Sequence, residues 1–298
     1  MTDLPPGFLL IDKDQGWTSH DVVAKVRNAV GGKVGHAGTL DPMATGLLIL
    51  AVGGATRLLR FVQDADKEYV ATALFGVATD SLDADGSILS RDPLPVTVED
   101  VEAVMERFRG DILQMPPMVS ARKVEGKRLY ELAREGKVVD RESRPVTIHS
   151  LELIDIAPSD YPEVTFRTVC STGTYIRTLA DDIARALGGR AHLTALRRVR
   201  NGSMSVEDAV DVDGVVSAVE RGTVDQLVIT ASTALAHLPD LSVSDPTAFR
   251  VRNGVVLEVN DVGGDSVTDL VRITDGTDAL IAVYRRVEQQ LRPEVVLG

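Results

Sequence analysis

A glycine-rich segment that leads directly into an apolar run is the strongest constraint on how this chain folds. Residues 31–46 contain five glycines among sixteen residues, and residues 47–52 are all apolar. Glycine permits backbone conformations that other residues avoid, and a short apolar run bounded by turn residues is typical of a core strand. We therefore expect a flexible loop that feeds a buried strand.

The other periodic segments predict a mixed α+β domain. Strands are expected where the sequence is apolar or alternating, at 8–12, 69–77, 148–156 and 164–171, the last two as a pair. Helices are expected at 21–30, 98–108, 129–135 and 175–187, the first capped by Thr18 or Ser19. The spacing is not that of a doubly wound fold, so a mixed, largely antiparallel sheet is preferred.

The C-terminal part is expected to be a separate small domain. Prolines and serines at 238–246 predict a linker, and β-like runs follow at 255–259, 270–274 and 280–287. A chain of 298 residues is long enough for two domains, because single cores usually stop growing near about 250–300 residues. The predicted domains are 1–237 and a β-rich module, 238–298.

The acidic residues are concentrated in the last third of the chain. The net charge of −12 argues against a nucleic-acid partner, but residues 201–298 account for most of it, with 16 acidic and only 7 basic residues. Residues 185–200 contain five arginines and no acid, and a local basic surface can bind a polyanion. A solvated helix face is the alternative interpretation of this stretch. Residues 114–130 are expected to form an exposed basic loop.

Several protein classes are disfavoured. No run of about 18 apolar residues and no signal-peptide pattern is found, so a soluble, cytoplasmic protein without membrane contact is expected. Cys170 is the single cysteine, and no two histidines have the helical spacing of zinc ligands. A metal site or a disulfide is therefore not expected.

Asp41 is the main catalytic candidate. It lies among glycines that let a ligand approach the backbone, and Pro42 stiffens the position after it. This setting suits a carboxylate nucleophile or base, although an Asp before Pro is more often a turn residue or a helix cap. Neither Gly-x-x-x-x-Gly-Lys-Ser/Thr nor Gly-x-Gly-x-x-Gly occurs here, which disfavours nucleotide binding.

The sequence Gly-His-Ala-Gly-Thr-Leu-Asp-Pro-Met-Ala-Thr-Gly at 35–46 resembles the catalytic motif of the TruB-type tRNA pseudouridine-55 synthases. Further motifs of this family occur in the same order at 11–19, 67–69, 114–130, 173–182 and 191–198. The resemblance covers residues 8 to about 235. The tail is similar, more weakly, to the RNA-binding PUA module that ends bacterial members.

The resemblance implies an isomerase that converts uridine to pseudouridine at position 55 of the tRNA T loop. Asp41 would be the catalytic carboxylate, and Arg177 would pair with it and keep it ionised. Asp41 could attack the ribose, add to the uracil ring or start elimination to a glycal. The reaction involves no redox change, so no cofactor is expected.

The resemblance also implies how a flipped-out base would be held. Tyr69 would stack on the uracil, Tyr175 and Leu196 would line its pocket, and His36 would enter the T loop. Phosphate contacts are expected from basic residues, namely Arg122, Lys123, Lys127, Arg128, Arg197 and Arg198. The partner would be the T-arm stem-loop of tRNA, bound by a monomer without an obligate protein partner.

Three alternatives remain open. The chain could resemble the archaeal and eukaryotic relatives that share the catalytic motif but act with a guide RNA and partner proteins. It could be a non-catalytic RNA-binding or tRNA-folding protein. A nucleotide-dependent enzyme built on the glycine-rich loop is the third alternative, and it predicts saturable ATP or NAD binding.

Overall fold

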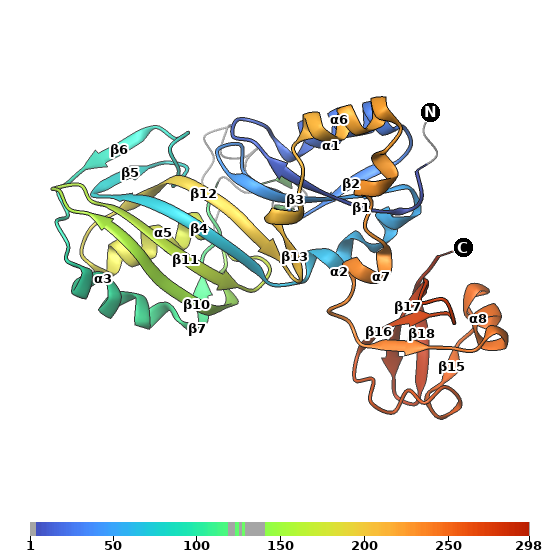
Figure 1. Cartoon of the computed structure of the whole chain (residues 1–298). Coiled ribbons are helices and arrows are strands. Elements are labelled where there is room, and N and C mark those ends of the chain that lie inside the picture. The colour runs from blue at the N-terminus through green and yellow to red at the C-terminus, as the bar shows by residue number, and fades with distance from the viewer. Residues whose placement is uncertain (1–3, 119–122, 125–126, 129–140, 298) are drawn as a thin grey trace. The chain divides into compact units, whose positions relative to one another are not determined.

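A computed structural model describes residues 4–118, 123–124, 127–128 and 141–297 (Figure 1). The contacts divide the chain into two compact units. Unit 1 comprises Met1–Asp41, Gly46–Ala65 and Asn201–Gly298, and unit 2 comprises Pro42–Thr45 and Asp66–Arg200. Neither unit is continuous in sequence.

Unit 1 begins with three strands, β1 (Gly7–Lys13), β2 (Val34–Ala37) and β3 (Thr45–Val52). Both β1 and β2 pair antiparallel with β3, so the predicted buried strand is confirmed. The expectation of a loop throughout 31–46 is wrong, because β2 lies within it. Pairing with β3 overrides the weak strand preference of a glycine-rich segment.

Two helices of unit 1 pack against each other, α1 (Ser19–Val30) and α6 (Val212–Arg221). The predicted cap of α1 is Thr18, whose hydroxyl accepts a hydrogen bond from the Asp21 N–H at 3.1 Å. The Asp21 carboxylate accepts from the Thr18 N–H in return, which completes a capping box. Shorter elements follow around them, α2 (Leu59–Gln63), β13 (Met204–Ser205) and α7 (Ala231–Ala234).

The C-terminal part of unit 1 is a five-stranded sheet, which confirms the β-rich module. Its strand order is β14 (Asp240–Ser242), β16 (Leu270–Thr274), β17 (Leu280–Val287), β18 (Gln290–Val296) and β15 (Leu257–Glu258). The predicted linker is wrong, since β14 pairs parallel with β16 and α8 (Asp245–Arg252) follows. Pro246 does not break α8 because the first helical turn needs no N–H from it.

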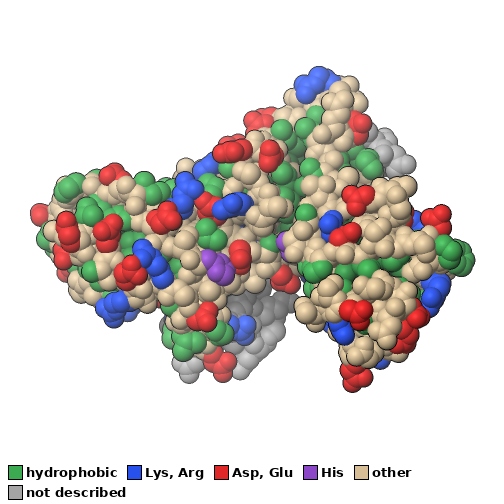
Figure 2. Space-filling model, turned by 60° about the horizontal axis from the view of Figure 1, so that its bottom comes forward, with side chains coloured by type: hydrophobic (Ala, Val, Ile, Leu, Met, Phe, Trp, Pro, Cys, Tyr) green, Lys and Arg blue, Asp and Glu red, His purple; other side chains and the backbone are tan. Residues whose placement is uncertain are grey.

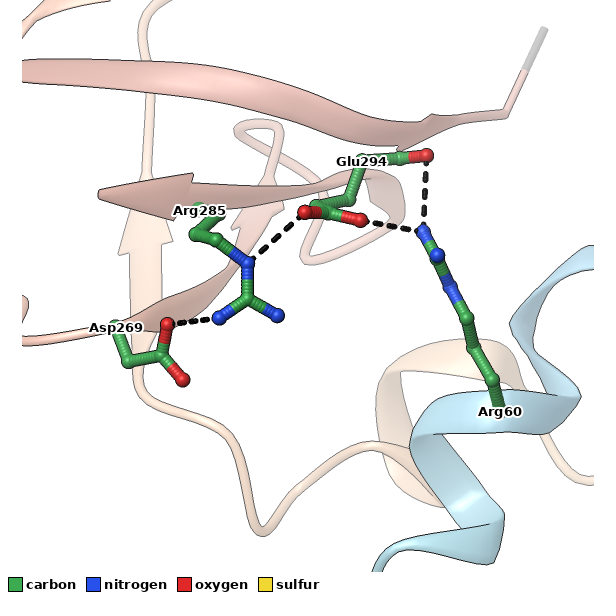
Figure 3. A network of polar contacts seen from close by, with 4 residues as sticks. All are labelled: Arg60, Asp269, Arg285 and Glu294. Carbon is green, nitrogen blue, oxygen red and sulfur yellow. Dashed lines mark hydrogen bonds and ion pairs between the residues drawn. The ribbon is translucent and has the colours of Figure 1, made fainter. Parts of the chain in front are cut away.

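An ionic network joins α2 to the C-terminal sheet within unit 1 (Figure 3). The Arg60 guanidinium on α2 donates to the Glu294 carboxylate at 2.6 Å, and Arg285 donates to the other oxygen of that carboxylate at 2.9 Å. Arg285 also binds Asp269. These guanidinium groups, with that of Arg285 first, lower the pKa of Glu294. The carboxylate is partly exposed, so the network contributes more to orientation than to stability.

Apolar packing also links these segments of unit 1. One buried cluster includes Phe8, Leu10 and Ile49 together with Val283 and Val295. It therefore contains residues from both sides of the predicted domain boundary at 237/238. A second cluster lies entirely within the C-terminal part and contains Tyr284, whose hydroxyl donates to the Val255 carbonyl at 2.9 Å. The domain boundary at 237/238 stays a prediction.

Unit 2 is built on a sheet with the order β12 (Ala191–Asn201), β4 (Lys67–Phe75), β11 (Glu163–Cys170), β10 (Arg144–Ala157) and β7 (Gly110–Gln114). The pairs β4–β11, β11–β10 and β10–β7 are antiparallel. Helices α3 (Val98–Met105) and α5 (Ile176–Ala186) contact each other and this sheet (Figure 1). The mixed α+β class and the paired strands are confirmed.

Three segments of unit 2 were expected to form other structures or are not described. The basic stretch 185–200, considered as a helix face, ends in strand β12. The expected loop 114–130 includes two short strands that pair with each other, β8 (Lys123–Val124) and β9 (Lys127–Arg128). A second short pair in unit 2 is formed by β5 (Val77–Thr79) and β6 (Ile88–Arg91). The helix predicted at 129–135 lies outside the described residues.

Candidate active site

Asp41 lies in the loop between β2 and β3 and is half-buried. The preceding loop residue, Leu40, is held by the side chain of Ser19 at the start of α1. The Ser19 hydroxyl accepts from the Leu40 N–H at 2.9 Å and donates to the Leu40 carbonyl at 3.2 Å. Ser19 is 1 % exposed, so water does not compete for these bonds. Both polar main-chain groups of Leu40, the residue before Asp41, are therefore held by the Ser19 hydroxyl.

His36 lies on β2, on the same unit as Asp41. Its ring packs edge-to-face against His20 of α1, with ring centroids 5.4 Å apart and an interplanar angle of 77°. Such a contact restricts the orientation of the His36 ring. His20 is exposed and His36 is half-buried, and β2, which carries His36, leads into the Asp41 loop.

Tyr69 lies on β4 of unit 2 and is 8 % exposed. The residue before it, Glu68, is buried and binds two arginines, Arg167 at 2.6 Å and Arg200. A buried carboxylate needs such partners to offset its lost hydration. The two ion pairs join β4 to the strands β11 and β12, and thus hold the strand segment that carries Tyr69.

Arg177 lies in the first turn of α5 and is 4 % exposed. One guanidinium nitrogen donates to the Asp83 carboxylate at 3.0 Å and to the Ser81 carbonyl at 2.9 Å. Asp83 is also buried, and the Ser81 hydroxyl donates to its other carboxylate oxygen. Arg177 is thus anchored by a buried ion pair with geometry set by two additional hydrogen bonds.

Tyr175 is the N-cap residue of α5 and is half-buried. Its main chain forms two hydrogen bonds with the side chain of Gln114, the last residue of β7. Leu196 lies on β12 and is 7 % exposed. Both residues belong to unit 2, together with Tyr69 and Arg177.

The predicted phosphate contacts have different outcomes. Arg197 is half-buried and donates to the Thr45 hydroxyl at 3.4 Å. Arg198 is 1 % exposed, and a buried guanidinium does not reach RNA phosphates, so its burial argues against that role. Arg122 lies outside the described residues; Lys123, Lys127 and Arg128 lie on β8 and β9.

The predicted site residues thus fall into two sets. Asp41 and His36 belong to unit 1, whereas Tyr69, Tyr175, Arg177 and Leu196 belong to unit 2. The ion pair between Asp41 and Arg177 stays a prediction. Sequence reasoning missed the supporting residues Ser19, Glu68, Asp83 and Gln114. Three of them, Ser19, Glu68 and Gln114, lie within the motifs, whereas Asp83 lies outside every motif.

Asp182 on α5 provides a test of the electrostatics of this unit. Burial and then the neighbouring Asp181 raise the pKa of Asp182 from 3.8 to about 6, against the opposing effect of Arg185. The folded state therefore holds a proton more strongly than the unfolded state, and the free energy of unfolding falls as the pH rises from about 4 to 6.

We expect Asp182→Asn to raise the free energy of unfolding at pH 7.5, by about 1 kcal/mol after allowance for solvent screening. Near pH 4 the two proteins should have similar stability, because the wild-type carboxyl is then largely neutral. Urea denaturation at both pH values measures this difference. A variant that is less stable than wild type at pH 7.5 would contradict the assigned cause.

Acidic and basic side chains occur together on part of the surface (Figure 2). Figure 2 shows acidic and basic side chains interspersed on the face in view. The net charge of −12 therefore leaves room for local contacts with a polyanion.

Two general features concern the described part of the chain. None of its helices is long and apolar enough to cross a membrane. Within the same residues, no group of three or more His, Cys, Asp or Glu side chains is arranged to hold a metal ion.

Two family models match consecutive parts of the sequence. The model of the TruB family pseudouridylate synthase N-terminal domain matches residues 25–176. The model of the tRNA pseudouridylate synthase B C-terminal domain matches residues 177–236. Together they contain every predicted site residue.

Curated relatives match over most of their length. A protein of Geobacillus thermodenitrificans named tRNA pseudouridine synthase B is 45% identical over 259 residues, which cover 85% of this chain and 86% of the relative. A protein of the same name from Burkholderia mallei is 41% identical over 298 residues, which cover 98% of this chain and 97% of the relative.

Chains in two solved complexes have a fold similar to that of this chain. A chain in a Cbf5-Nop10-Gar1 complex matches with a TM-score of 0.77 and 28% identity, covering 98% of this chain and 84% of that chain. A chain in an H/ACA RNP bound to a substrate RNA containing 2'-deoxyuridine matches with a TM-score of 0.76 and 26% identity, covering 98% and 85%.

Proposed function

Because this chain belongs to the TruB family of pseudouridylate synthases, we propose that it isomerises uridine to pseudouridine at position 55 in the T loop of tRNA. The enzyme class and the tRNA substrate follow from relatives that are 40% to 45% identical over most of the chain. The position and the carboxylate mechanism are our proposal. The observation that carries it is the Asp41 loop, whose main chain is held by the buried Ser19.

Asp41 acts as the carboxylate nucleophile or base on the flipped-out uridine. The reaction breaks the bond between N1 and the ribose, turns the base and forms a new bond to C5. A carboxylate that directly follows a main-chain residue held by two buried hydrogen bonds is suited to either role. Arg177 pairs with Asp41 and favours its ionised form by opposite charge. The ion pair with Asp83 fixes the guanidinium before substrate binds.

The aromatic and apolar side chains receive the base. Tyr69 stacks on the uracil, and Tyr175 and Leu196 line the pocket around it. His36 enters the T loop and offsets part of the unstacking cost of a few kcal/mol. Its edge-to-face contact with His20 supports this role because it orients the ring.

RNA backbone contacts come from Arg197 and from the basic residues at 122–128. They position the T-arm stem-loop without reading its sequence. We propose that the chain acts on bare tRNA as a monomer in the cytoplasm, without a partner protein. Because similar chains occur in an H/ACA RNP and in a Cbf5-Nop10-Gar1 complex, the alternative that requires a guide RNA and partner proteins is tested as well.

The test is incubation of the purified chain with an unmodified tRNA in the absence of ATP, guide RNA and partner proteins. Position-specific detection should find pseudouridine at position 55, and a tRNA with cytidine at that position should yield none. Product at another uridine would refute the position. No product without a guide, from a folded protein that binds tRNA, would favour the guided or the non-catalytic alternative.

Replacement of Ser19 tests the support of the Asp41 loop. Ser19→Ala leaves the Leu40 N–H and carbonyl without their partner, which costs about 1–3 kcal/mol in a buried setting. A small displacement of Asp41 should then lower the single-turnover rate by roughly 10- to 100-fold. The RNA dissociation constant should change little, because Ser19 does not reach the surface.

Thr18→Ala is the matched control for Ser19→Ala. It removes the adjacent hydroxyl, which caps α1 but does not touch the loop, and costs about 1 kcal/mol. The Thr18 variant should therefore lose stability and keep its rate. Equal loss of rate in both variants would show that helix stability, rather than loop position, controls activity.

A further inference from the structure

Helix α5 begins at a residue whose side chain does not cap it. Tyr175 is the N-cap residue, with φ −99° and ψ 107°, and it forms no side-chain cap hydrogen bond. Ser, Thr, Asp and Asn are preferred at this position because their side-chain oxygens accept from free N–H groups of the first turn. A tyrosine gives up that stabilisation at the point where the proposed function places an aromatic ring beside the base.

Gln114 holds the main chain of Tyr175 from a strand that lies far away in the sequence. Its side-chain oxygen accepts from the Tyr175 N–H at 2.8 Å, and its side-chain nitrogen donates to the Tyr175 carbonyl at 3.1 Å. The same carbonyl accepts the first hydrogen bond of the helix, from the Leu179 N–H at 3.0 Å. The polar groups of the Tyr175 main chain are thus fully used.

The burial of Gln114 makes these two bonds specific. Its side chain is almost inaccessible, with 2 % of the residue exposed, so water cannot replace either partner. A bond in each direction fixes the rotation of the Tyr175 backbone as well as its position. A single bond would leave that rotation free.

We propose that Gln114 is a positioning residue of the synthase site, which sets the Tyr175 ring and the start of α5 that carries Arg177. The proposal rests on the proposed function. Gln114 acts through Tyr175 and does not need to touch the RNA. Its effect is on alignment, and a misplacement of about 1 Å can cost roughly 100-fold in rate.

Gln114→Glu tests the proposal because the protonation state of the new side chain decides whether both hydrogen bonds to the Tyr175 main chain form. These two hydrogen bonds are called the clamp below. The ionised carboxylate can accept from the Tyr175 N–H but repels the Tyr175 carbonyl. The protonated carboxyl can accept and donate, as the amide does. Lowering the pH should therefore restore the clamp, and the burial of the position favours the protonated form.

The experiment compares single-turnover rates on T-arm RNA, each divided by the wild-type rate at the same pH. This ratio removes the pH dependence that the variant shares with wild type, including that of Asp182 on α5, whose pKa burial raises to about 6. The other charged groups on the elements around Gln114 are Asp111 on β7, Arg144 on β10, and Arg177 and Asp181 on α5, and they are common to both proteins. At pH 8 we expect a ratio of roughly 0.01 to 0.1. We expect the ratio to rise at least about fivefold by pH 5.5.

Two further variants complete the test. Gln114→Leu cannot form the clamp at any pH, so its rate ratio should be low and independent of pH, with an RNA dissociation constant within about threefold of wild type. Thr147→Val removes a side-chain hydrogen bond from β10 to Asp111, which lies on the same strand β7 as Gln114, without touching Tyr175. It should keep the wild-type rate.

The proposal is overturned if the rate ratio of Gln114→Glu does not depend on pH, or if Gln114→Leu reacts as wild type does. It is also overturned if Thr147→Val loses as much rate as Gln114→Leu. Failure of the proposed function is distinguishable, because wild type itself would then form no pseudouridine in the T arm.

Discussion

Asp41→Asn is expected to bind T-arm RNA as wild type does and to form no measurable pseudouridine. The amide has nearly the shape of the carboxylate, but it is neither an effective nucleophile nor a base. Removal of one such group lowers the rate by roughly 10⁴-fold in other enzymes. Rates from rapid mixing and dissociation constants from filter binding separate the two effects.

The same loop offers a control for this variant. Thr39→Ser lies two positions earlier and keeps a hydroxyl, so it should leave the reaction intact. Residual pseudouridine formation by Asp41→Asn within about tenfold of wild type would remove Asp41 from the catalytic role. Loss of RNA binding together with the reaction would instead assign Asp41 to recognition.

Asp83→Asn is expected to cause the second largest effect, on stability and activity together. The substitution removes the ionic contact between the Asp83 carboxylate and the buried Arg177 guanidinium, and breaking a buried ion pair costs about 3–5 kcal/mol. Under the proposed function, Arg177 then lacks a contact that positions its guanidinium for pairing with Asp41. We expect the single-turnover rate to fall by roughly 100-fold or more.

A double variant separates these two consequences. Arg177→Met combined with Asp83→Asn removes both charges, so most of the lost free energy of unfolding should return. The rate should not return, because the guanidinium is then absent. Urea denaturation and single-turnover assays of the single and double variants measure both quantities. Recovery of activity in the double variant would show that Arg177 has only a structural role.

The order of the motifs placed the chain in its family without any tertiary information. It also identified Asp41, which lies in a short, contiguous sequence pattern. Strands such as β3, β4, β10 and β11 were predictable because their apolar residues follow one another or alternate along the chain. Such periodicity depends only on residues that are neighbours in the sequence, so it can be recognised without the tertiary structure.

Other elements were mispredicted where pairing partners outweigh local preference. The segment 240–242 contains few apolar residues, yet it forms β14 because β16 supplies its hydrogen bonds. The segment 34–37 lies among glycines, yet it forms β2 on the edge of β3. The 191–198 motif was recognised by its residues, whereas its strand conformation was not.

The sequence by itself determined the family, the reaction class that membership implies and the candidate catalytic carboxylate. Only the tertiary structure decided which residues support the site: Ser19 beneath Leu40, Asp83 beside Arg177, and Gln114 against Tyr175. The physical reason is sequence separation. These bonds join residues 21, 94 and 61 positions apart, and only the packing of strands and helices brings such distant polar groups within about 3 Å.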